Sequence, residues 1–383
     1  MTGQERGTGL RLTTVMYVIT KQYKYYLTNL IYSSGVTERY LGRRWIWNTF
    51  DKLPKGSEAA SAVFAEVDGA HLRYVASGVI IPVWISGEAD LRPDPASLRH
   101  QSIRSDIRKM EVNQLECCIA KDMESFEDFY YHMYVPHLKK TYGEAAFMLP
   151  LSRLRTRFNS GKLLLIRQKA EVIAGLLLTF ENNQPYMRHL GVRDGNRRLV
   201  KDGAIAAAYE YAFRYLREQG FSKVRLGRSR SFLADGVLQF KKKRAQSIVS
   251  VSTDKFVFRA LTDADSTRAF LRNNPFVFEE TNNIGGIVFF AGGTPLTLKL
   301  LRNTYDKYFH VGLSRLIVFF LREQGATEIA EHDLELLALE LQKLGHAGFY
   351  VEALSECDSV QLIRKIGCDG TAIAIYPKVR GSC

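Results

Sequence analysis

The stretch GFSKVRLGRSRSFLADGVLQFKKKR, residues 220–244, decides the fold that we expect for the middle of the chain. Its first residue, Gly220, follows a helical pattern over 203–219 and stands where helices commonly end in glycine. A short strand is expected next, over 223–226, and Asp235-Gly236 is typical of a turn. The stretch therefore predicts a helix that crosses over to a following strand.

Three strands and two helices are expected before that crossover helix, because their apolar residues recur with strand and helix periods. The strands are predicted over 162–168, 172–180 and 186–192, and the helices over 125–142 and 151–159. Pro136 should kink the first helix. Two later strands, over 248–252 and 255–260, are expected to close the unit. This order predicts an α/β (α+β) fold whose sheet is mixed, antiparallel before the crossover helix and parallel across it.

The same stretch resembles a known family. Gly220, the strand ending in Leu226-Gly227-Arg228-Ser229, then Asp235-Gly236-Val237 and Phe240-Lys241 together resemble the C-terminal half of Fem-type acyltransferase domains of the GNAT superfamily. This branch includes proteins named for cellulose and exopolysaccharide biosynthesis. The resemblance covers about residues 100–255. It implies a GNAT-like splayed mixed sheet, in which an acyl donor enters between two parting strands, here 186–192 and 223–226.

The resemblance also implies an enzymatic function. The expected protein is an N-acyltransferase that moves an acyl group from an acyl-CoA to an amine of a small-molecule, peptide or polysaccharide-pathway acceptor. Two alternatives stay open. One is an aminoacyl-tRNA-dependent aminoacyl transferase, with tRNA as a partner, and the other is a catalytically degenerate protein that binds a polyanion or another protein.

The donor-binding residues follow from the resemblance. GNAT enzymes usually carry Arg/Gln-x-x-Gly-x-Gly/Ala where the donor's pyrophosphate rests on the N-terminus of the central helix. This chain has Arg198-Leu-Val-Lys201-Asp-Gly203, so Arg198 and Gly203 fit, and Lys201 replaces the first glycine. Lys201 could crowd or grip a coenzyme A pyrophosphate, and Fem-type ligases, which use aminoacyl-tRNA, also lack the strict motif. The complete set expected to bind the donor is Arg198, Lys201, Gly203, Ala204, Arg228 and Lys241.

The candidates for catalysis are His189, His137 and Tyr134, with His132 nearby in sequence. An amine must lose a proton as it attacks an acyl carbonyl, and histidine can accept one near neutral pH. His189 is expected mid-strand beside the donor, where neighbouring backbone N–H groups could polarise the carbonyl. His137 and Tyr134 lie in a helix that resembles the one lining the acceptor site in this family.

The net charge of +13 is distributed unevenly. Residues 223–244 hold eight basic side chains and one acid, Asp235, so this segment alone carries +7. A solvated surface and a site for a polyanion, such as coenzyme phosphates, a tRNA backbone or an acidic carrier, are both open interpretations. The basic residues of this segment are Lys223, Arg225, Arg228, Arg230, Lys241, Lys242, Lys243 and Arg244, and two further clusters are Arg193, Arg197, Arg198 and Lys201, and Arg99, Arg104, Arg108 and Lys109.

Composition indicates the compartment. Five cysteines with no C-x-x-C pair predict unpaired thiols in a cytoplasmic protein, and no metal site is expected. No apolar run reaches the length of about 18 residues that a membrane-spanning helix needs. Residues 15–31 mix aromatic side chains with lysines. They are expected to form a buried first element, with peripheral contact to a membrane surface as the alternative.

Three successive domains are expected along the chain. Residues 1–98 form an N-terminal region without an assigned role, which contains a strand over 76–85 and ends near Pro93 and Pro95. Residues 99–260 form the acyltransferase domain. Residues 261–383 form a further α/β domain of unknown role, because strand and helix patterns alternate there. Its strands are expected over 286–290, 316–320, 348–352 and 372–376, and its helices over 296–308 and 332–344.

Overall fold

The structure is a computed structural model, and it describes residues 1–43, 53–75, 77–92, 101–120, 122–245, 247–280, 283–321, 336–337, 339–340, 343 and 348–354. The chain divides into two compact units. Unit 1 comprises Met1–Ile85, Ser229–Gln239 and the described residues from Ile248 onward, and unit 2 comprises Ser86–Arg228 and Phe240–Ser247. The units interleave along the chain, and the three successive domains predicted from the sequence stay a prediction.

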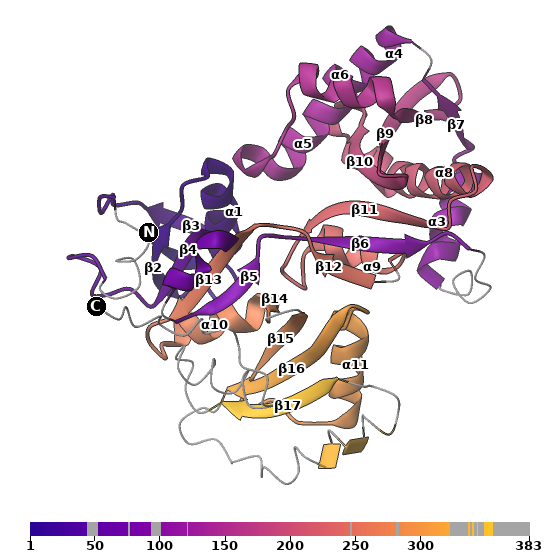
Figure 1. The fold of residues 1–383 in the computed structure, drawn as a ribbon. Helices are drawn as coiled ribbons and strands as arrows, with labels where there is room; N and C mark the ends of the chain where they lie inside the picture. The colour runs from indigo at the N-terminus through magenta and orange to yellow at the C-terminus, as the bar shows by residue number, and fades with distance from the viewer. Residues whose placement is uncertain are drawn as a thin grey trace, which may run out of the picture. The chain divides into compact units, whose positions relative to one another are not determined.

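Unit 2 is built on a mixed sheet with the strand order β12-β6-β11-β10-β9-β8-β7, in which the edge strand β12 corresponds to the strand predicted over 248–252 (Figure 1). Strands β7 to β10 pair antiparallel in chain order, whereas β10 and β11 are parallel. The predicted antiparallel strands, the crossover helix and the α/β fold class are therefore confirmed. The elements are β6 (Trp84–Asp90), β7 (Leu115–Ile119), β8 (Lys162–Gln168), β9 (Glu171–Glu181), β10 (Gln184–Val192), β11 (Lys223–Arg230), α3 (Gln101–Val112), α4 (Met123–Asp128), η3 (Phe129–Tyr134), α5 (Val135–Tyr142), η4 (Gly143–Ala145), α6 (Leu151–Ser160), η5 (Arg193–Gly195), α7 (Arg197–Lys201) and α8 (Ala204–Glu218).

Helices cover both faces of this sheet, as the alternation of apolar residues along the strands requires. Leu164 and Leu176 pack with Ala204, Ala207 and other small residues of α8 on one face. On the other face, α4, η3 and α6 form a separate core with residues from β8 and β9 (Figure 1). The residues buried in that second core are Phe126, Phe129, Met133, Tyr134, Leu154, Leu163, Leu165 and Leu177.

The helix predicted over 125–142 is present, but its middle is a π-helical turn, η3, between α4 and α5. Pro136 lies at the start of α5. It has no N–H to donate to the preceding turn, which favours a wider turn before it and accounts for the predicted irregularity.

Two glycines that face each other across β9 and β10 let the π turn lie against the sheet. Gly191 and Gly175 are register partners. A Cβ atom on Gly191 would lie 2.5 Å from the backbone nitrogen of Tyr134, and one on Gly175 would lie 2.5 Å from a ring carbon of Phe129. No side chain fits at position 191 unless the helix backbone moves, so this close approach fixes where η3 sits.

The change Gly191→Ala should therefore destabilise unit 2 by about 1–3 kcal/mol, the usual cost of forcing an extra methyl into a packed site. Differential scanning calorimetry would measure the loss as a lower Tm. Gly236→Ala is the control, because no atom lies within 4 Å of a Cβ atom there. An unchanged Tm for Gly191→Ala would contradict the tight packing of η3 on β10.

Unit 1 contains two sheets that share one core of aromatic and aliphatic side chains. The first has the order β3-β1-β2-β4-β13-β5 and the second the order β14-β15-β16-β17. Strands β15, β16 and β17 are parallel, as predicted for this part of the chain. The elements are β1 (Thr2–Glu5), β2 (Arg11–Tyr17), α1 (Lys21–Ile31), β3 (Tyr32–Thr37), β4 (Ala62–Asp68), η1 (Gly69–Tyr74), β5 (Val79–Pro82), β13 (Asp254–Ala260), α10 (Asp265–Asn273), β14 (Phe276–Glu279), β15 (Ile284–Ala291), α11 (Leu298–Tyr308), β16 (Leu313–Leu321) and β17 (Phe349–Leu354).

Several sequence predictions need correction. The strand predicted over 255–260 does not close the acyltransferase sheet, because β13 pairs with β4 and β5 in unit 1. The strand predicted over 76–85 is two strands, β5 and β6, and residue 76 lies outside the described residues. The polar loop predicted over 193–202 contains the short helices η5 and α7. Along the chain, the residue ranges of α9 (Gly236–Lys242) and β12 (Ser247–Ser250) each include a unit boundary.

The remaining predictions concern the chain ends. The N-terminal stretch 15–31 forms the end of β2 and the helix α1, and Tyr23, Leu27 and Ile31 of α1 are buried in the core of unit 1. In the part of the chain that the structure describes, no helix is long and apolar enough to cross a membrane. The boundary predicted at Pro93 and Pro95, the strand over 372–376 and most of the helix over 332–344 lie outside the described residues.

Candidate functional site

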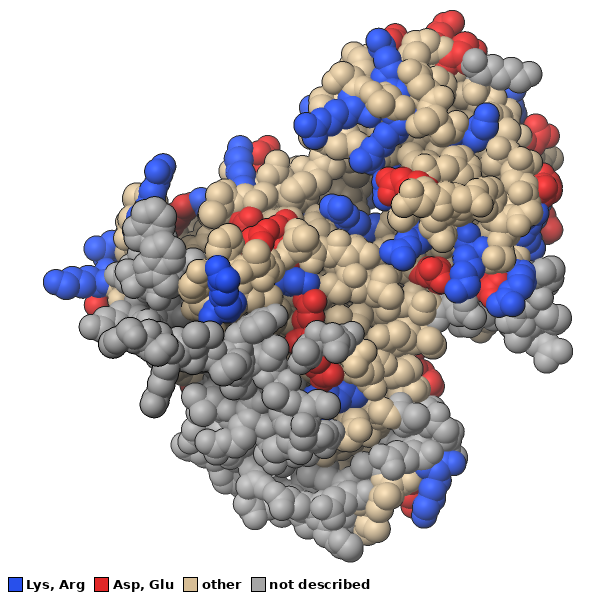
Figure 2. Space-filling view, viewed as in Figure 1, with Lys and Arg blue, Asp and Glu red and all other residues tan. Residues whose placement is uncertain are grey.

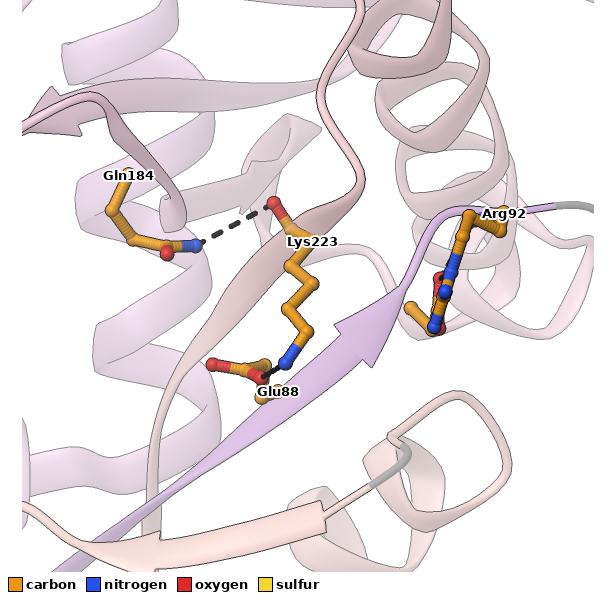
Figure 3. Close-up of polar contacts among 5 residues, drawn as sticks. Glu88, Arg92, Gln184 and Lys223 are labelled. Atoms are coloured by element: carbon orange, nitrogen blue, oxygen red, sulfur yellow. Dashed lines mark hydrogen bonds and ion pairs between the residues drawn. The ribbon is translucent and has the colours of Figure 1, made fainter.

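The parallel strands β10 and β11 are joined at one end only. Tyr186↔Arg225 is the single register pair between them among the described residues. Beside it, the Gln184 side-chain amide donates to the carbonyl oxygen of Lys223 at 3.5 Å, and Lys223 Nζ lies 2.9 Å from Oε1 of Glu88 on β6 (Figure 3). Strand β9, in contrast, stays paired with β10 as far as Val192, with one shift of register between Arg188 and Leu190. Beyond Tyr186, the backbone groups of β10 that point away from β9 therefore have no register partner in β11.

A residue in the left-handed region lies in each strand just beyond that pair. His189 has a φ of 53° and stands at a β-bulge in the pairing of β10 with β9. Gly227 of β11 has a φ of 70°, and a Cβ atom on it would lie 2.7 Å from the carbonyl oxygen of Met187. Bulges re-aim a strand, and left-handed backbone is uncommon for residues other than glycine. His189 and Gly227 therefore interrupt the regular backbone of β10 and β11 where the two strands separate.

The His189 side chain accepts a hydrogen bond from Arg157. The His189 Nε2 lies 2.6 Å from the Arg157 guanidinium, and the imidazole meets the ring of Tyr134 edge to face, with the ring centroids 5.7 Å apart. Burial, followed by the charges of Arg157 and Arg188, lowers the pKa of His189 to about 3. The ring is thus neutral with its proton on Nδ1, and the lone pair on Nε2 is already engaged. In this arrangement His189 has no free nitrogen to accept a proton.

The other two candidates for catalysis lie on the helix that packs against β10. Tyr134 is buried, its hydroxyl accepts a hydrogen bond from the N–H of Leu149 at 3.1 Å, and burial raises its pKa. The Tyr134 hydroxyl therefore keeps its proton at neutral pH and can donate it in a hydrogen bond. His137 on α5 is partly buried, and burial lowers its pKa. No hydrogen bond engages the His137 ring within the described residues, so the neutral ring keeps an acceptor.

Three arginines gather around one carboxylate near the bulge. Arg188 forms hydrogen bonds through two nitrogens to Glu181, which holds the pKa of that carboxyl below its usual range. Arg157 and Arg228 lie close enough to Glu181 to add to this lowering. Burial and the charge of Arg188 lower the pKa of Arg157. Tyr186 supports the cluster, because the guanidinium of Arg188 lies 4.2 Å from the centroid of its ring.

The predicted donor loop is compact. Arg198 is 88% exposed and lies 3.7 Å from Asp202 in a loose ion pair, and Lys201 is also exposed. Gly203 has a φ of 103° and begins α8 without a side-chain cap. Gly203 and Ala204 are buried, and a Cβ atom on Gly203 would lie 3.2 Å from the Cβ of Lys109 on α3.

Hydrogen bonds within the loop use several of its backbone N–H groups. The N–H of Arg198 donates to the Asn196 side chain, and that of Gly203 donates to the carbonyl of Val200. Exposed cationic side chains surround this end of α8. They come from Lys109, Arg198 and Lys201.

The basic segment 223–244 is only partly a solvated surface. Lys241 is buried, and its Nζ donates to the carbonyl oxygen of Arg228 at 2.8 Å. Arg244 is also buried and pairs with Asp106 at 2.5 Å and Glu210 at 3.5 Å. Arg230, in unit 1, is buried as well, with its guanidinium 3.7 Å from the ring centroid of Trp84. Each of these three buried cations is held by a carboxylate, a carbonyl or an aromatic ring, so none of them belongs to a solvated surface.

Some of the predicted site residues are brought together and others are not. Tyr134 meets His189 beside the bulge, and Lys241 meets Arg228 at the end of β11. The donor loop forms a third group at the start of α8. Sequence reasoning missed Arg157 and named Lys109 only as a member of a basic cluster. The sequence does contain an indication for Arg157. It follows Leu154 by three residues, so both side chains lie on the same face of α6, the face that packs against the sheet.

The fold class of unit 2 is defined by its mixed sheet, in which the two parallel strands β10 and β11 separate beside the crossover helix α8. It has the GNAT-like splayed sheet that the sequence resemblance implies.

Comparisons with known proteins concern the fold alone. No protein-family model matches the chain, and no curated protein matches it. Among solved structures, the chain is similar to L-PGS from Bacillus licheniformis, with a TM-score of 0.34 and 11% identity over 51% of this chain and 67% of that one. It is similar to FemX, with a TM-score of 0.33 and 12% identity over 52% of this chain and 72% of that one. For a GCN5-related N-acetyltransferase from Sphaerobacter thermophilus, the TM-score is 0.30 and the identity 12%, over 51% of this chain and 58% of that one. Because these TM-scores are low, the fold assignment rests on strand order and register.

The low pKa of His189 predicts a pH dependence of stability. Between pH 6.5 and about 3, the unfolded chain binds a proton on this ring that the folded chain does not. Stability should therefore fall as the pH drops through this window, and His189 should account for up to about 2 kcal/mol at pH 5. Urea unfolding at pH 7 and pH 5 would measure it, with His189→Gln losing this part of the change. Equal losses in the two proteins would contradict the neutral, buried ring.

Proposed function

We propose that unit 2 is an N-acyltransferase that moves an acyl group from an acyl-CoA to an amine. The observation that carries the proposal is the parting of β10 and β11 after Tyr186↔Arg225. Backbone N–H and C=O groups left without a strand partner need other hydrogen-bonding groups. The amide-bearing arm of an acyl-CoA supplies such groups in an extended chain, so it can take the place of the missing strand pairing.

The cations at the start of α8 suit the phosphate end of this donor. Arg198 and Lys201 on α7 are exposed, and Lys109 of α3 lies beside Gly203. These side chains can reach an anion without any change in the buried backbone of Gly203 and Ala204. Recognition of the phosphates would then depend on charged side chains, with the dipole of the 15-residue helix α8 adding to the attraction.

The reaction needs a proton acceptor and a polarised carbonyl. The amine nitrogen attacks the thioester carbonyl carbon, and a tetrahedral intermediate forms. It collapses as the carbon–sulfur bond breaks, and coenzyme A leaves as a thiolate that takes up a proton. We assign the base to His137, whose neutral ring keeps an acceptor nitrogen. Backbone N–H groups of β10 beyond His189 would polarise the carbonyl, and Tyr134 would orient the reacting groups by a hydrogen bond.

An aminoacyl-tRNA donor is the second candidate. The observation that favours it is the compact donor loop, in which Gly203 and Ala204 are buried and Lys201 stands where GNAT enzymes usually carry glycine. A tRNA would contact exposed cations rather than a backbone cradle. The net charge of +13 suits such a partner.

A thermal-shift titration separates these donors. Coenzyme A at 100 times its Kd should stabilise the protein by about 2.7 kcal/mol, because it binds only the folded state. Arg198→Ala should weaken binding about tenfold by removing a charged contact. Arg153→Ala, on an exposed position of α6, should bind as the parent does.

The other outcomes of this titration are also informative. No shift with millimolar coenzyme A, together with tRNA binding that weakens steeply with salt, would replace the acyl-CoA proposal by the aminoacyl-tRNA one. Binding of neither would leave the catalytically degenerate protein that binds another partner.

A further inference from the structure

Arg157 lacks the carboxylate that neighbouring arginines have. On the same helix, Arg155 lies 2.8 Å from Glu127, and in the same unit Arg193 lies 2.7 Å from Asp128. Arg157 instead donates to the neutral imidazole of His189 at 2.6 Å. No carboxylate is within ion-pair distance of Arg157 in the described part of unit 2. A partly buried guanidinium that donates to a neutral ring keeps an uncompensated charge, which is costly unless an anion is bound.

The charge around Arg157 is also uncompensated as a group. Arg157, Arg188 and Arg228 supply three positive charges, and Glu181 supplies one negative charge, which leaves a net charge of +2. Both terminal nitrogens of the Arg188 guanidinium already donate to Glu181. Arg228 is exposed, and it has no ion pair among the described residues. Arg157 and Arg228 are thus the two guanidinium groups of this cluster without an ion pair among the described residues. Figure 2 shows Lys and Arg side chains interspersed with Asp and Glu on the visible face of the molecule.

Arg157 and Arg188 lie on the side of the sheet opposite to α8, and the charge of Arg228 acts on Arg157 and Glu181 of this group. Arg188 pairs in register with Leu177, which is buried in the core under η3 and α6. Arg157 belongs to α6, and His189 meets Tyr134 of η3. The cations expected to hold the donor's phosphates lie instead at the start of α8. A ligand group bound at the arginines would therefore be separate from those phosphates.

We propose that Arg157 and Arg228 bind a phosphate group carried by the amine acceptor, so that the acceptor is a phosphorylated amine. This rests on the proposed acyltransferase function, since it assigns the α6 side of the strand opening to the acceptor. A guanidinium presents paired N–H donors that match two phosphate oxygens, and a net charge of +2 matches a phosphate dianion better than a single carboxylate. The Arg157–His189 contact then holds the guanidinium in place before the ligand arrives.

Inorganic phosphate is the probe for the experiment. The full-length protein is titrated with phosphate at constant ionic strength, with chloride as the balancing ion, and Tm is followed with and without saturating coenzyme A. The parent should show a saturable rise in Tm that persists with coenzyme A present. Arg157→Gln and Arg228→Gln should each weaken the apparent affinity at least about tenfold. Arg155→Gln, on the same helix, should leave it unchanged.

Several outcomes would overturn the proposal. These are no saturable rise in the parent, an equal rise in Arg157→Gln and Arg228→Gln, an equal rise with acetate in place of phosphate, or loss of the rise when coenzyme A is bound. Arg228 is exposed, so its variant keeps the test sound if Arg157→Gln folds poorly. A rise that depends on Arg157, in a protein that fails to bind coenzyme A, would support the phosphate site while refuting the proposed donor.

Discussion

The parting of β10 from β11 is the feature on which the rest of unit 2 depends. A sheet interior with unpaired backbone groups is unfavourable unless another group satisfies them. Here the pairing stops after Tyr186↔Arg225, and His189 and Gly227 take left-handed conformations just beyond it. The opening is supported from both faces. Helix α8 packs small residues against one, and the π turn η3 lies on the glycine pair Gly175 and Gly191 on the other.

Electrostatics distinguish the two sides of this opening. On the α8 side, exposed cations surround a helix start at which Gly203 and Ala204 are buried. On the η3 and α6 side, the neutral imidazole of His189 is bonded to Arg157, and three arginines share the single carboxylate of Glu181. Because His189 is engaged by Arg157, proton transfer is assigned to a different ring, that of His137. Under the two proposals, donor and acceptor would have different charged contacts, so changes on one side should affect the binding of one substrate first.

The sequence predicts the regular parts of unit 2 well. Strands β8, β9 and β10 are found from their apolar alternation, and α8 from its helical period and from Gly220 at its end. These features depend on local residue types. The pairing of β13 with β4 and β5, in contrast, could not be predicted, because strands of both sheets have the same alternating pattern of apolar residues. That pattern does not determine which strands a given strand pairs with.

The candidate site is predictable only in part for the same reason. His189 and Tyr134 are identified from sequence, but their contact requires the π turn, which depends on Gly191 and Gly175 meeting across two strands. Arg157 is separated from His189 by 32 residues and joins it only in the fold. The burial of Lys241 and Arg244 likewise depends on partners elsewhere in unit 2. A run of basic residues therefore cannot be divided by sequence alone into structural and ligand-binding members.

Amide hydrogen exchange tests most directly whether the strand opening is where the donor binds. The exchange of backbone N–H groups in β10 and β11 would be compared with and without coenzyme A, with β8 as an internal reference. Our account predicts slower exchange on binding for Leu190–Val192 and for residues 226–228, because the donor would occupy their free backbone groups, and little change in β8. Protection confined to other elements, with exchange in β10 and β11 unchanged while coenzyme A is bound, would contradict it.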